Sequence, residues 1–370
     1  MNQNRLIEEF TKLVSIDSPS LFEREMADYI TEQLKSLEFS VAEDDAGERL
    51  GGSSGNIHAV LPGSLPGEPL MFSAHLDTVE PSRGKRAVVH EDGTITSAGD
   101  TVLGADDCAA LAAILEALRS IREEGLPHRT IELLLTVAEE IYCGGSAHFD
   151  FSRVRARECY VLDLTGPVGT AAVQAPTLIS FEATVIGKSA HAGFNPEDGV
   201  HAIAAAADAI ACLHMGRIDE DTTLNIGVIE GGLAGNIVPE RCIVRGESRS
   251  FAHDKAVWQV DQVREQFERS AARFGASVEF LSRCCCEAYA TPAEHPVVKR
   301  FERVCRELGL SPALERTFGG SDNNGFAKHG ITGIVIATAM NRCHSCGEYT
   351  TADELRRAAA LTAALMTSEN

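Results

Sequence analysis

The 370-residue sequence contains no run of 18 consecutive apolar residues, about the length that a membrane-spanning helix needs. It is also poor in basic residues, since 33 Lys and Arg face 54 Asp and Glu and give a net charge of −21. A chain this acidic repels the phosphate backbone of nucleic acids. We therefore expect neither a membrane nor a nucleic acid as a partner.

The sequence also lacks the cysteine pattern of a disulfide-bonded protein and a secretion signal. The eleven cysteines are an odd number, and three of them, Cys284, Cys285 and Cys286, are consecutive. Such usage does not fit the disulfide framework of a secreted protein. The first residues, MNQNRLIEEFTKLV, lack the apolar stretch of a signal peptide. Together these features predict a location in the reducing cytoplasm.

The composition that remains is that of an ordinary globular protein, with 44% hydrophobic and 24% charged residues. A length of 370 residues exceeds what one hydrophobic core usually supports, so two domains are expected. Ser20 followed by Glu23 matches a capping box and predicts a helix start. Short apolar runs then alternate with helical patterns, and strands are predicted at 56–60, 70–74, 131–137 and 160–162. This alternation predicts an α/β domain whose mixed, largely parallel sheet is flanked by helices.

The middle of the chain has a different pattern. It predicts a strand at 178–186, a helix at 199–213, strands at 222–229 and 242–247, a helix at 255–274 and a strand at 277–281. This βαββαβ order is that of a ferredoxin-like α+β domain. We therefore predict a lid domain, residues 177–290, inserted into a catalytic domain made of 1–176 and 291–370. One continuous α/β domain is the alternative.

His75 and Asp77 stand at the end of the predicted strand 70–74. Residues two apart share a strand face, and a metal-binding histidine usually gives its second ring N–H to a neighbouring acceptor such as a carboxylate. The alternative is a surface histidine near an acid in a turn. His-x-Asp alone does not decide between them.

Two pairs of adjacent acids follow. Asp106 and Asp107 precede an apolar helical stretch, where acids either favour the helix N-terminus or bridge metal ions. Glu139 and Glu140 come directly after the strand 131–137. Neighbouring residues at a strand end point in different directions, so one can bind a metal while the other serves as a base. A solvated acidic pair is the alternative.

Two further segments place similar residues after strands. Asp163 closes the predicted strand 160–162, and His344 follows a predicted strand at 331–337. In open α/β sheets, ligands bind at the edge formed by the carboxyl ends of the strands. Five such segments together predict a ligand site at that edge.

The patterns H-L-D-T, G-A-D-D, E-E, V-x-D and N-x-x-H-S-x-x-E, in this order, resemble those of a known family. It is the di-zinc metallopeptidase family of peptidase T, carboxypeptidase G and succinyl-diaminopimelate desuccinylase, and the likeness is strongest to peptidase T. S-A-H-A-G at 189–193, N-I-V-P-E at 236–240 and G-G-S-D at 319–322 also match. The resemblance covers almost the whole chain, including the inserted lid domain.

The resemblance implies two divalent metal ions, zinc by preference, with cobalt or manganese as alternatives. It places His75, Asp106 and Asp163 around one ion. It places Asp106, Glu140 and His344 around the other, so that Asp106 is the bridge. A water shared by the two ions would attack the substrate.

The same resemblance assigns the remaining roles. Asp77 would orient His75, Glu139 would be the general base, and the bond between Asp106 and Asp107 would be cis. One departure from the family pattern is Cys108, where many relatives have a lysine or arginine.

In the lid domain, the resemblance implies that His191 stabilises the oxyanion and that Asn236 and Arg249 contact the substrate. His191 can act only if the two domains, or two subunits, come together, which leaves a homodimer through the lid open. For Arg249, the alternative is an ordinary surface arginine. Cys343 and Cys346 flank His344, but no second pair completes a zinc knuckle, so we interpret them as packing residues.

The predicted function is that of a metal-dependent exopeptidase for short peptides, most simply a tripeptide aminopeptidase. A deacylase or amidohydrolase for N-acyl amino acids is the second interpretation, because the metal ligands do not encode the choice. A peptide-binding relative without catalysis is the third, and the presence of Glu139 and of all five metal-ligand residues is evidence against it.

Overall fold

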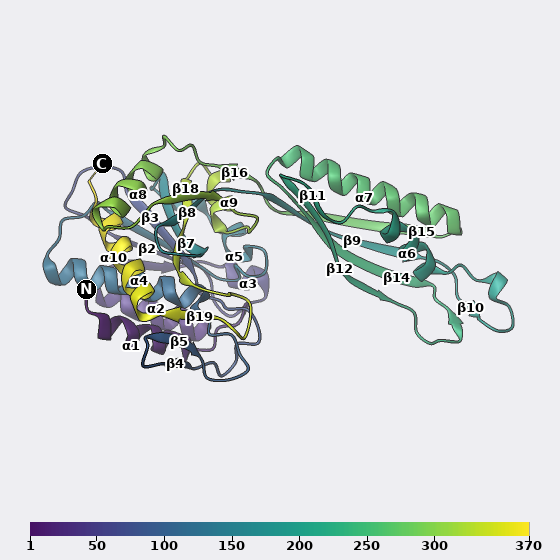
Figure 1. Cartoon of the computed structure of the whole chain (residues 1–370), viewed down its shortest axis with the longest axis horizontal. Helices are drawn as coiled ribbons and strands as arrows, with labels where there is room; N and C mark the ends of the chain where they lie inside the picture. Colours follow the sequence, from purple (N-terminus) through teal and green to yellow (C-terminus); the bar gives the residue numbers. More distant parts are fainter. Residues whose placement is uncertain (370) are drawn as a thin grey trace. The chain divides into compact units, whose positions relative to one another are not determined.

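Figure 1 shows the computed structural model of the chain, which describes residues 1–369. These residues form two compact units. The small unit consists of Ala175–Tyr289 and Phe318–Gly320, and the large unit contains the rest. The sequence predicts boundaries at 176/177 and 290/291, whereas the structure has them at 174/175 and 289/290. The segment Phe318–Gly320 is an addition to the small unit that the sequence pattern did not predict.

The large unit contains a mixed sheet with the strand order β1-β2-β6-β3-β7-β18-β8-β16, and β17 pairs with β8. Its centre is parallel, because β3 pairs in parallel with β6 and β7, and β7 with β18. The strands are β1 Ser40–Glu43, β2 Ile57–Leu61, β3 Leu70–His75, β6 Ile131–Thr136, β7 Glu158–Thr165, β8 Thr170–Ala175, β16 Tyr289–Ala290, β17 Ala313–Arg316 and β18 Thr332–Met340. The predicted mixed, largely parallel sheet is confirmed.

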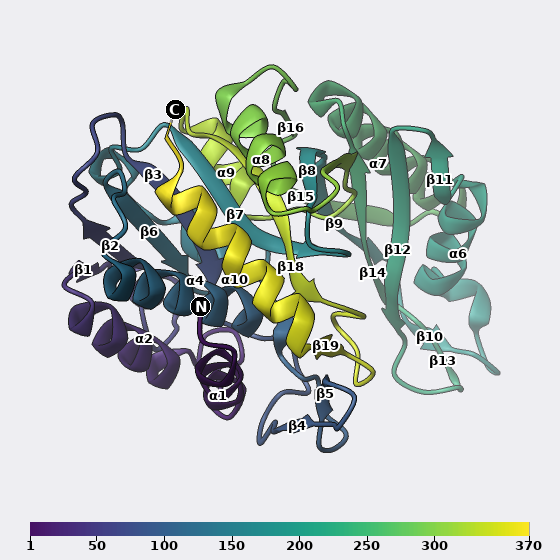
Figure 2. The same cartoon turned by 60° about the vertical axis from the view of Figure 1, so that its left-hand side comes forward.

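Helices cover this sheet, and Figure 2 shows α4 and α10 crossing one of its faces. The long helix α4 is buried along most of its length, and β3 and β6 are buried at every residue. Burial on both faces explains why these strands are continuous apolar runs without alternation. The helices of this unit are α1 Gln3–Val14, α2 Arg24–Ser36, α3 Ala46–Leu50, α4 Ala105–Glu124, α5 Gly144–Ala147, α8 Pro296–Glu307, α9 Asp322–Lys328 and α10 Ala352–Thr367.

A small three-stranded sheet in the same unit has the order β19-β5-β4, formed by Tyr349–Thr351, Thr94–Ser97 and Ala87–Val89. Its strand β19 directly precedes α10. Among the described residues, no helix has the length and apolar character to cross a membrane.

The predicted capping box at Ser20 and Glu23 is wrong. The helix α2 begins at Arg24, and its first residue has no side-chain cap. The Ser20 hydroxyl instead donates a hydrogen bond to the Asp77 carboxylate, 2.6 Å away. Glu23 Oε1 accepts the backbone N–H groups of Leu21 and Ala138, at 2.8 and 3.0 Å. Partners from distant parts of the chain therefore replace the local cap that the sequence pattern indicates.

The small unit has an antiparallel sheet with the order β11-β12-β14-β9-β15, against which α6 and α7 pack. The order β9, α6, β12, β14, α7, β15 is the predicted βαββαβ arrangement of a ferredoxin-like domain. The elements are β9 Thr177–Ile186, α6 Ala202–Cys212, β11 Gly216–Asp219, β12 Thr222–Gly231, β14 Arg241–Ser250, α7 His253–Phe274 and β15 Ser277–Cys286. A separate two-stranded ribbon is formed by β10 Ala190–His191 and β13 Ile237–Val238.

Candidate metal centre

The carboxyl ends of the parallel strands carry the candidate residues. His75 is the last residue of β3, and Asp163 lies near the end of β7. Glu140 and His344 follow β6 and β18 after short loops. Because neighbouring parallel strands run in the same direction, their ends meet at one edge of the sheet. Asp106 reaches this edge from the start of α4.

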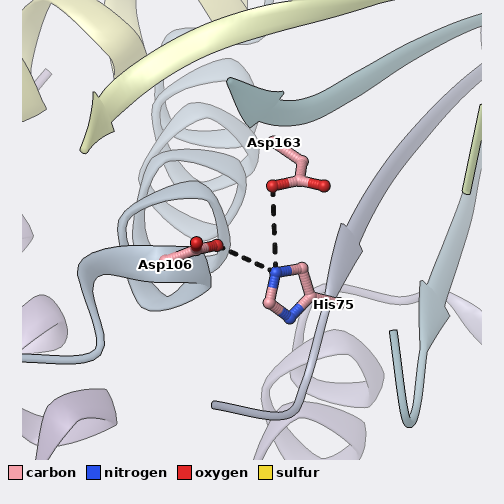
Figure 3. A group of neighbouring side chains, drawn as sticks. All are labelled: His75, Asp106 and Asp163. Atoms are coloured by element: carbon pink, nitrogen blue, oxygen red, sulfur yellow. Dashed lines mark hydrogen bonds and ion pairs between the residues drawn. The ribbon is translucent and has the colours of Figure 1, made fainter. Parts of the chain in front are cut away.

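The first group contains His75, Asp106 and Asp163, whose side chains point toward one another (Figure 3). His75 Nε2 lies 3.0 Å from Asp106 Oδ1 and 3.9 Å from Asp163 Oδ1. The other ring nitrogen, Nδ1, lies 2.9 Å from the backbone oxygen of Asp77. That carbonyl can only accept, so the neutral ring carries its proton on Nδ1 and turns the Nε2 lone pair toward the two acids.

The second group contains Asp106, Glu140 and His344. His344 Nε2 lies 3.0 Å from Glu140 Oε2 and 3.3 Å from Asp106 Oδ2. Asp106 therefore offers Oδ1 to the first group and Oδ2 to the second. This is the arrangement that a carboxylate bridging two ions requires.

The residues present fit two divalent ions. In a tetrahedral site with bonds of about 2.0–2.2 Å, neighbouring ligand atoms stand about 3.3–3.5 Å apart, close to the separations seen in both groups. Glu140 Oε1 is buried and has no hydrogen-bond partner among the described residues, so it is free to bind an ion. Nitrogen and carboxylate oxygen donors suit zinc, cobalt and manganese. Cys343 and Cys346 belong to neither group. Cys343 is half-buried against the core, but Cys346 is exposed, so its interpretation as a packing residue is wrong.

Glu348 holds the segment that carries Asp106, and the sequence analysis did not assign it a role. Glu348 Oε2 accepts the Gly104 N–H at 2.6 Å, and Oε1 accepts the Asp106 N–H at 3.0 Å. Burial, followed by the charge of Asp106, raises the pKa of Glu348 to about 7. The bond between Asp106 and Asp107 is cis, as the resemblance implies. The final E of the N-x-x-H-S-x-x-E pattern was the signal that pointed to Glu348.

The carboxylate of Asp77 has a role beyond the predicted one. It accepts the N–H groups of Glu139 and Glu140, at 3.0 and 3.2 Å, and the Ser20 hydroxyl. Its Oδ1 lies 3.5 Å from His75 Nδ1, farther than the backbone oxygen of the same residue. Asp77 therefore orients His75 mainly through its main chain, while its side chain fixes the backbone of the two glutamates.

The centre crowds negative charges into a buried space. Burial, helped by the charge of Asp163, raises the pKa of Glu139 well above its usual range, and burial also raises the pKa of Asp163. Hydrogen bonds from His344 to Asp106 and to Glu140 raise the pKa of His344 to about 10. Carboxylates this close repel one another, so cations are needed to keep several of them ionised together.

His191 and Asn236 lie together in the small unit. The Ala192 N–H donates to the Asn236 backbone oxygen at 3.0 Å. His191 Nδ1 accepts the N–H groups of Gly193 and Phe194, at 3.1 and 3.2 Å. Its neutral ring must therefore carry the proton on Nε2, which makes Nε2 a hydrogen-bond donor. The ring of Phe194, 85% exposed, stacks on His191 with the centroids 4.2 Å apart.

Arg249 lies at the opposite end of the small unit. It pairs with Leu178 near the start of β9, whereas Arg241 pairs with Ile186 at the other end. Eight residues of extended strand separate Arg249 from Arg241, roughly 26 Å. The β10–β13 ribbon that carries His191 continues beyond the Arg241 end (Figure 1). The Arg249 guanidinium donates to the backbone oxygen of Phe318 and to Glu247, both at 2.7 Å.

Comparisons with known proteins agree with this geometry. The profile of the peptidase family M20/M25/M40 matches residues 71–368. The uncharacterized protein YqjE of Bacillus subtilis (strain 168) is 37% identical over 99% of this chain and 98% of its own. The structure of aminopeptidase PepT from Bacillus cereus has a TM-score of 0.90 and 38% identity, and that of a tripeptidase from Staphylococcus aureus has 0.95 and 33%. Each of these two alignments covers 99% of this chain and 98% of the other.

Proposed function

The chain belongs to the peptidase family M20/M25/M40, and on this basis we propose that it is a tripeptide aminopeptidase that uses two zinc ions. The observation that carries the proposal is the bridging geometry of Asp106, which offers one carboxylate oxygen to each candidate ligand group. The similarity to an aminopeptidase and a tripeptidase, both over nearly the whole chain, supports the choice of peptides as substrates.

When bound, the two ions would polarise the scissile carbonyl and make a water nucleophilic at neutral pH. Glu139 is the buried carboxylate next to the ligand Glu140, and it belongs to neither ligand group. It would accept a proton from the attacking water and pass it to the leaving amine. Asp77 supports this proposal, because its carboxylate accepts the N–H groups of both glutamates and so fixes the backbone from which both side chains project.

The small unit would supply contacts to the substrate. His191 Nε2–H is available as a donor and would stabilise the negative charge on the carbonyl oxygen during attack. Asn236, next to it on the ribbon, would help to place the peptide. The guanidinium of Arg249 would bind the terminal carboxylate of the peptide, since a planar fork suits that group.

We further propose that His191 acts in the active site of a second subunit. A tripeptide spans only about 10 Å, whereas roughly 26 Å of strand separates Arg249 from the end of the unit that carries His191. One small unit therefore cannot offer both residues to one short peptide. Arg249 donates to the backbone oxygen of Phe318, three residues before Ser321, where the chain continues into the residues of the large unit. This leaves His191 as the residue that a partner contributes, in a dimer formed through the small unit.

The test is a panel of free and N-acetylated di- and tripeptides assayed with zinc, cobalt and manganese. We expect free tripeptides to lose their N-terminal residue and N-acetylated peptides to remain intact. Glu139→Gln serves as the control for a contaminating peptidase. Faster release from N-acyl amino acids than from free tripeptides would make the protein a deacylase and overturn the aminopeptidase assignment. The cytoplasmic location stays a prediction.

A further inference from the structure

Lys85 is the unusual basic residue of the large unit, because its side chain is almost completely buried, with 1% exposed. The other buried lysine or arginine side chains of the described chain are Arg129 and Arg300. Both lie at the opposite edge of the sheet, since Arg129 precedes β6 and Arg300 pairs with Glu158 at the start of β7. Lys85 is therefore the one buried lysine or arginine, among residues 1–369, on the side of the candidate metal centre.

The position of Lys85 is fixed against the loop that carries Asp106. Its Cε would lie only 2.8 Å from a Cβ added to Gly104, so the two residues are in direct contact. Gly104 has a φ of +74° and donates its N–H to Glu348. The same Glu348 carboxylate accepts the N–H of Asp106. Lys85 thus lies behind the backbone that places the bridging aspartate.

The charge of Lys85 has no ion-pair partner in contact. Its ammonium donates to the backbone oxygen of Ile16, and within the described chain no carboxylate lies at ion-pair distance. Burial lowers the pKa of Lys85, and the carboxylates of Asp17, Glu348 and Glu80 oppose that shift. Burial raises the pKa of the nearby Cys108 thiol to about 12, so this thiol is uncharged at neutral pH. Burying an unpaired ammonium is costly unless a favourable field offsets the loss of hydration. Of the groups that provide this field, Glu348 belongs to the metal centre, where its carboxylate accepts the N–H groups of Gly104 and Asp106.

We propose that Lys85 is a positioning residue of the metal centre, a fixed positive charge that acts on Glu348 and, through Gly104 and Glu348, holds Asp106 in its bridging position. This inference rests on the proposed metal centre. Two divalent ions would bring four positive charges to a site whose carboxyl groups include those of Asp77, Asp106, Asp107, Glu139, Glu140, Asp163 and Glu348. The fixed cation matters most when the ions are absent, because bound ions already offset much of the repulsion.

The first experiment measures melting temperatures of chelator-treated protein and of protein loaded with zinc, cobalt or manganese. Lys85→Met keeps the length of the side chain and removes its charge. We expect the difference between the loaded and the metal-free melting temperature to widen by about 3–6 °C in this variant. Arg86→Met is the matched control, since Arg86 is the exposed neighbour and loses the same charge. Its difference should stay within about 1 °C of the wild type.

A rescue experiment separates charge from packing. Cys108 is buried in α4, two residues after Asp106, and lies within electrostatic range of Lys85. In Lys85→Ala/Cys108→Lys a cation returns from α4, and in Lys85→Ala/Cys108→Met only side-chain volume returns. We expect the lysine variant alone to recover the wild-type difference in melting temperature.

Several results would overturn the inference. One is that Lys85→Met lowers the metal-free and the loaded melting temperatures equally. Another is that both double variants recover the wild-type difference in melting temperature equally. The third is that neither double variant folds. Folding of Lys85→Met only in the presence of metal would support it. If the wild type gains no stability from any of the three metals, the proposed function fails as well. If the wild type gains stability and Lys85→Met shows an unchanged difference, only the role of Lys85 fails.

Discussion

A mixed-subunit experiment tests whether His191 acts across a dimer. His191→Ala removes the proposed oxyanion donor, and Glu139→Gln removes the proposed base, so each variant alone should be nearly inactive. Co-expression of the two chains yields mixed dimers in which one large unit has an intact Glu139 and the partner supplies an intact His191. Such a dimer should contain one complete active site.

The size of the recovery follows from the geometry. Random pairing makes half of the dimers mixed, and one of the two sites in each mixed dimer is complete, so about a quarter of wild-type activity should return. The structural reason is the roughly 26 Å of strand that keeps Arg249 away from the His191 end of the same unit. The matching pair, Arg249→Ala with Glu139→Gln, should recover almost nothing, because Arg249 is expected to serve its own chain.

The assay is tripeptide hydrolysis by mixed dimers isolated with two different affinity tags, with the dimer mass confirmed by light scattering. Isolated mixed dimers should have about half of wild-type activity, since one of two sites is complete. Mixed dimers that form but stay inactive would refute the contribution of His191 from a partner. A wild-type protein that is fully active as a monomer would refute it equally.

Three further predictions concern the metal centre and its support. Glu139→Gln should keep about two metal ions per chain and lose about 10²–10⁴-fold in turnover, whereas Glu140→Gln should lose metal affinity. Metal analysis and turnover measurements of the two purified variants check this prediction. If the two variants show the opposite results, Glu140 is the base and Glu139 is the ligand. Chelator treatment of the wild type should abolish peptide hydrolysis and lower the melting temperature, and zinc should restore both; activity that survives complete metal removal would contradict the metal mechanism. Burial, with the charge of Asp77, raises the pKa of Glu23 to about 7, so its contribution to stability should be fully present below about pH 4.5 and be lost as the pH rises through 7. Glu23→Gln keeps the oxygen that accepts the N–H groups of Leu21 and Ala138 but cannot ionise. As the pH rises from 5 to 8, the metal-free variant should therefore gain stability relative to the metal-free wild type, by up to about 3 kcal/mol in denaturant unfolding. If the difference in unfolding free energy between the two proteins does not change with pH, Glu23 is not buried as a charge.

The arrangement of strands was largely predictable because it depends on local patterns. The central strands are apolar at every residue because both of their faces are buried, and this is visible in a window of a few residues. The positions of His75 and Glu140 at strand ends were visible in the same way. Their convergence follows from the parallel direction of the strands, which sends all carboxyl ends to one edge. The order of motifs then indicated the family, and with it the bridging role of Asp106.

The partners of several of these residues could not be predicted locally. Ser20 and Glu23 match a capping box, yet Ser20 binds Asp77, 57 residues away. Glu348 binds the Gly104 N–H across 244 residues. A cap contributes about 1 kcal/mol, and a charge-assisted or buried hydrogen bond to a distant partner outweighs it once the chain has folded. A sequence pattern reports only the local interaction, so it predicted the helix cap.

The sequence by itself determined the chemistry that is present, namely which acids and histidines follow which strands and which family pattern they form. Only the tertiary structure decided how that chemistry is divided. It places Arg249 and His191 at opposite ends of the small unit, assigns Phe318–Gly320 to that unit, and buries Lys85 behind Gly104. These facts depend on strand register and on packing between segments far apart in the chain. Residue type and spacing in the sequence do not reveal strand register or long-range packing, because both are fixed by the sum of many contacts across the whole fold.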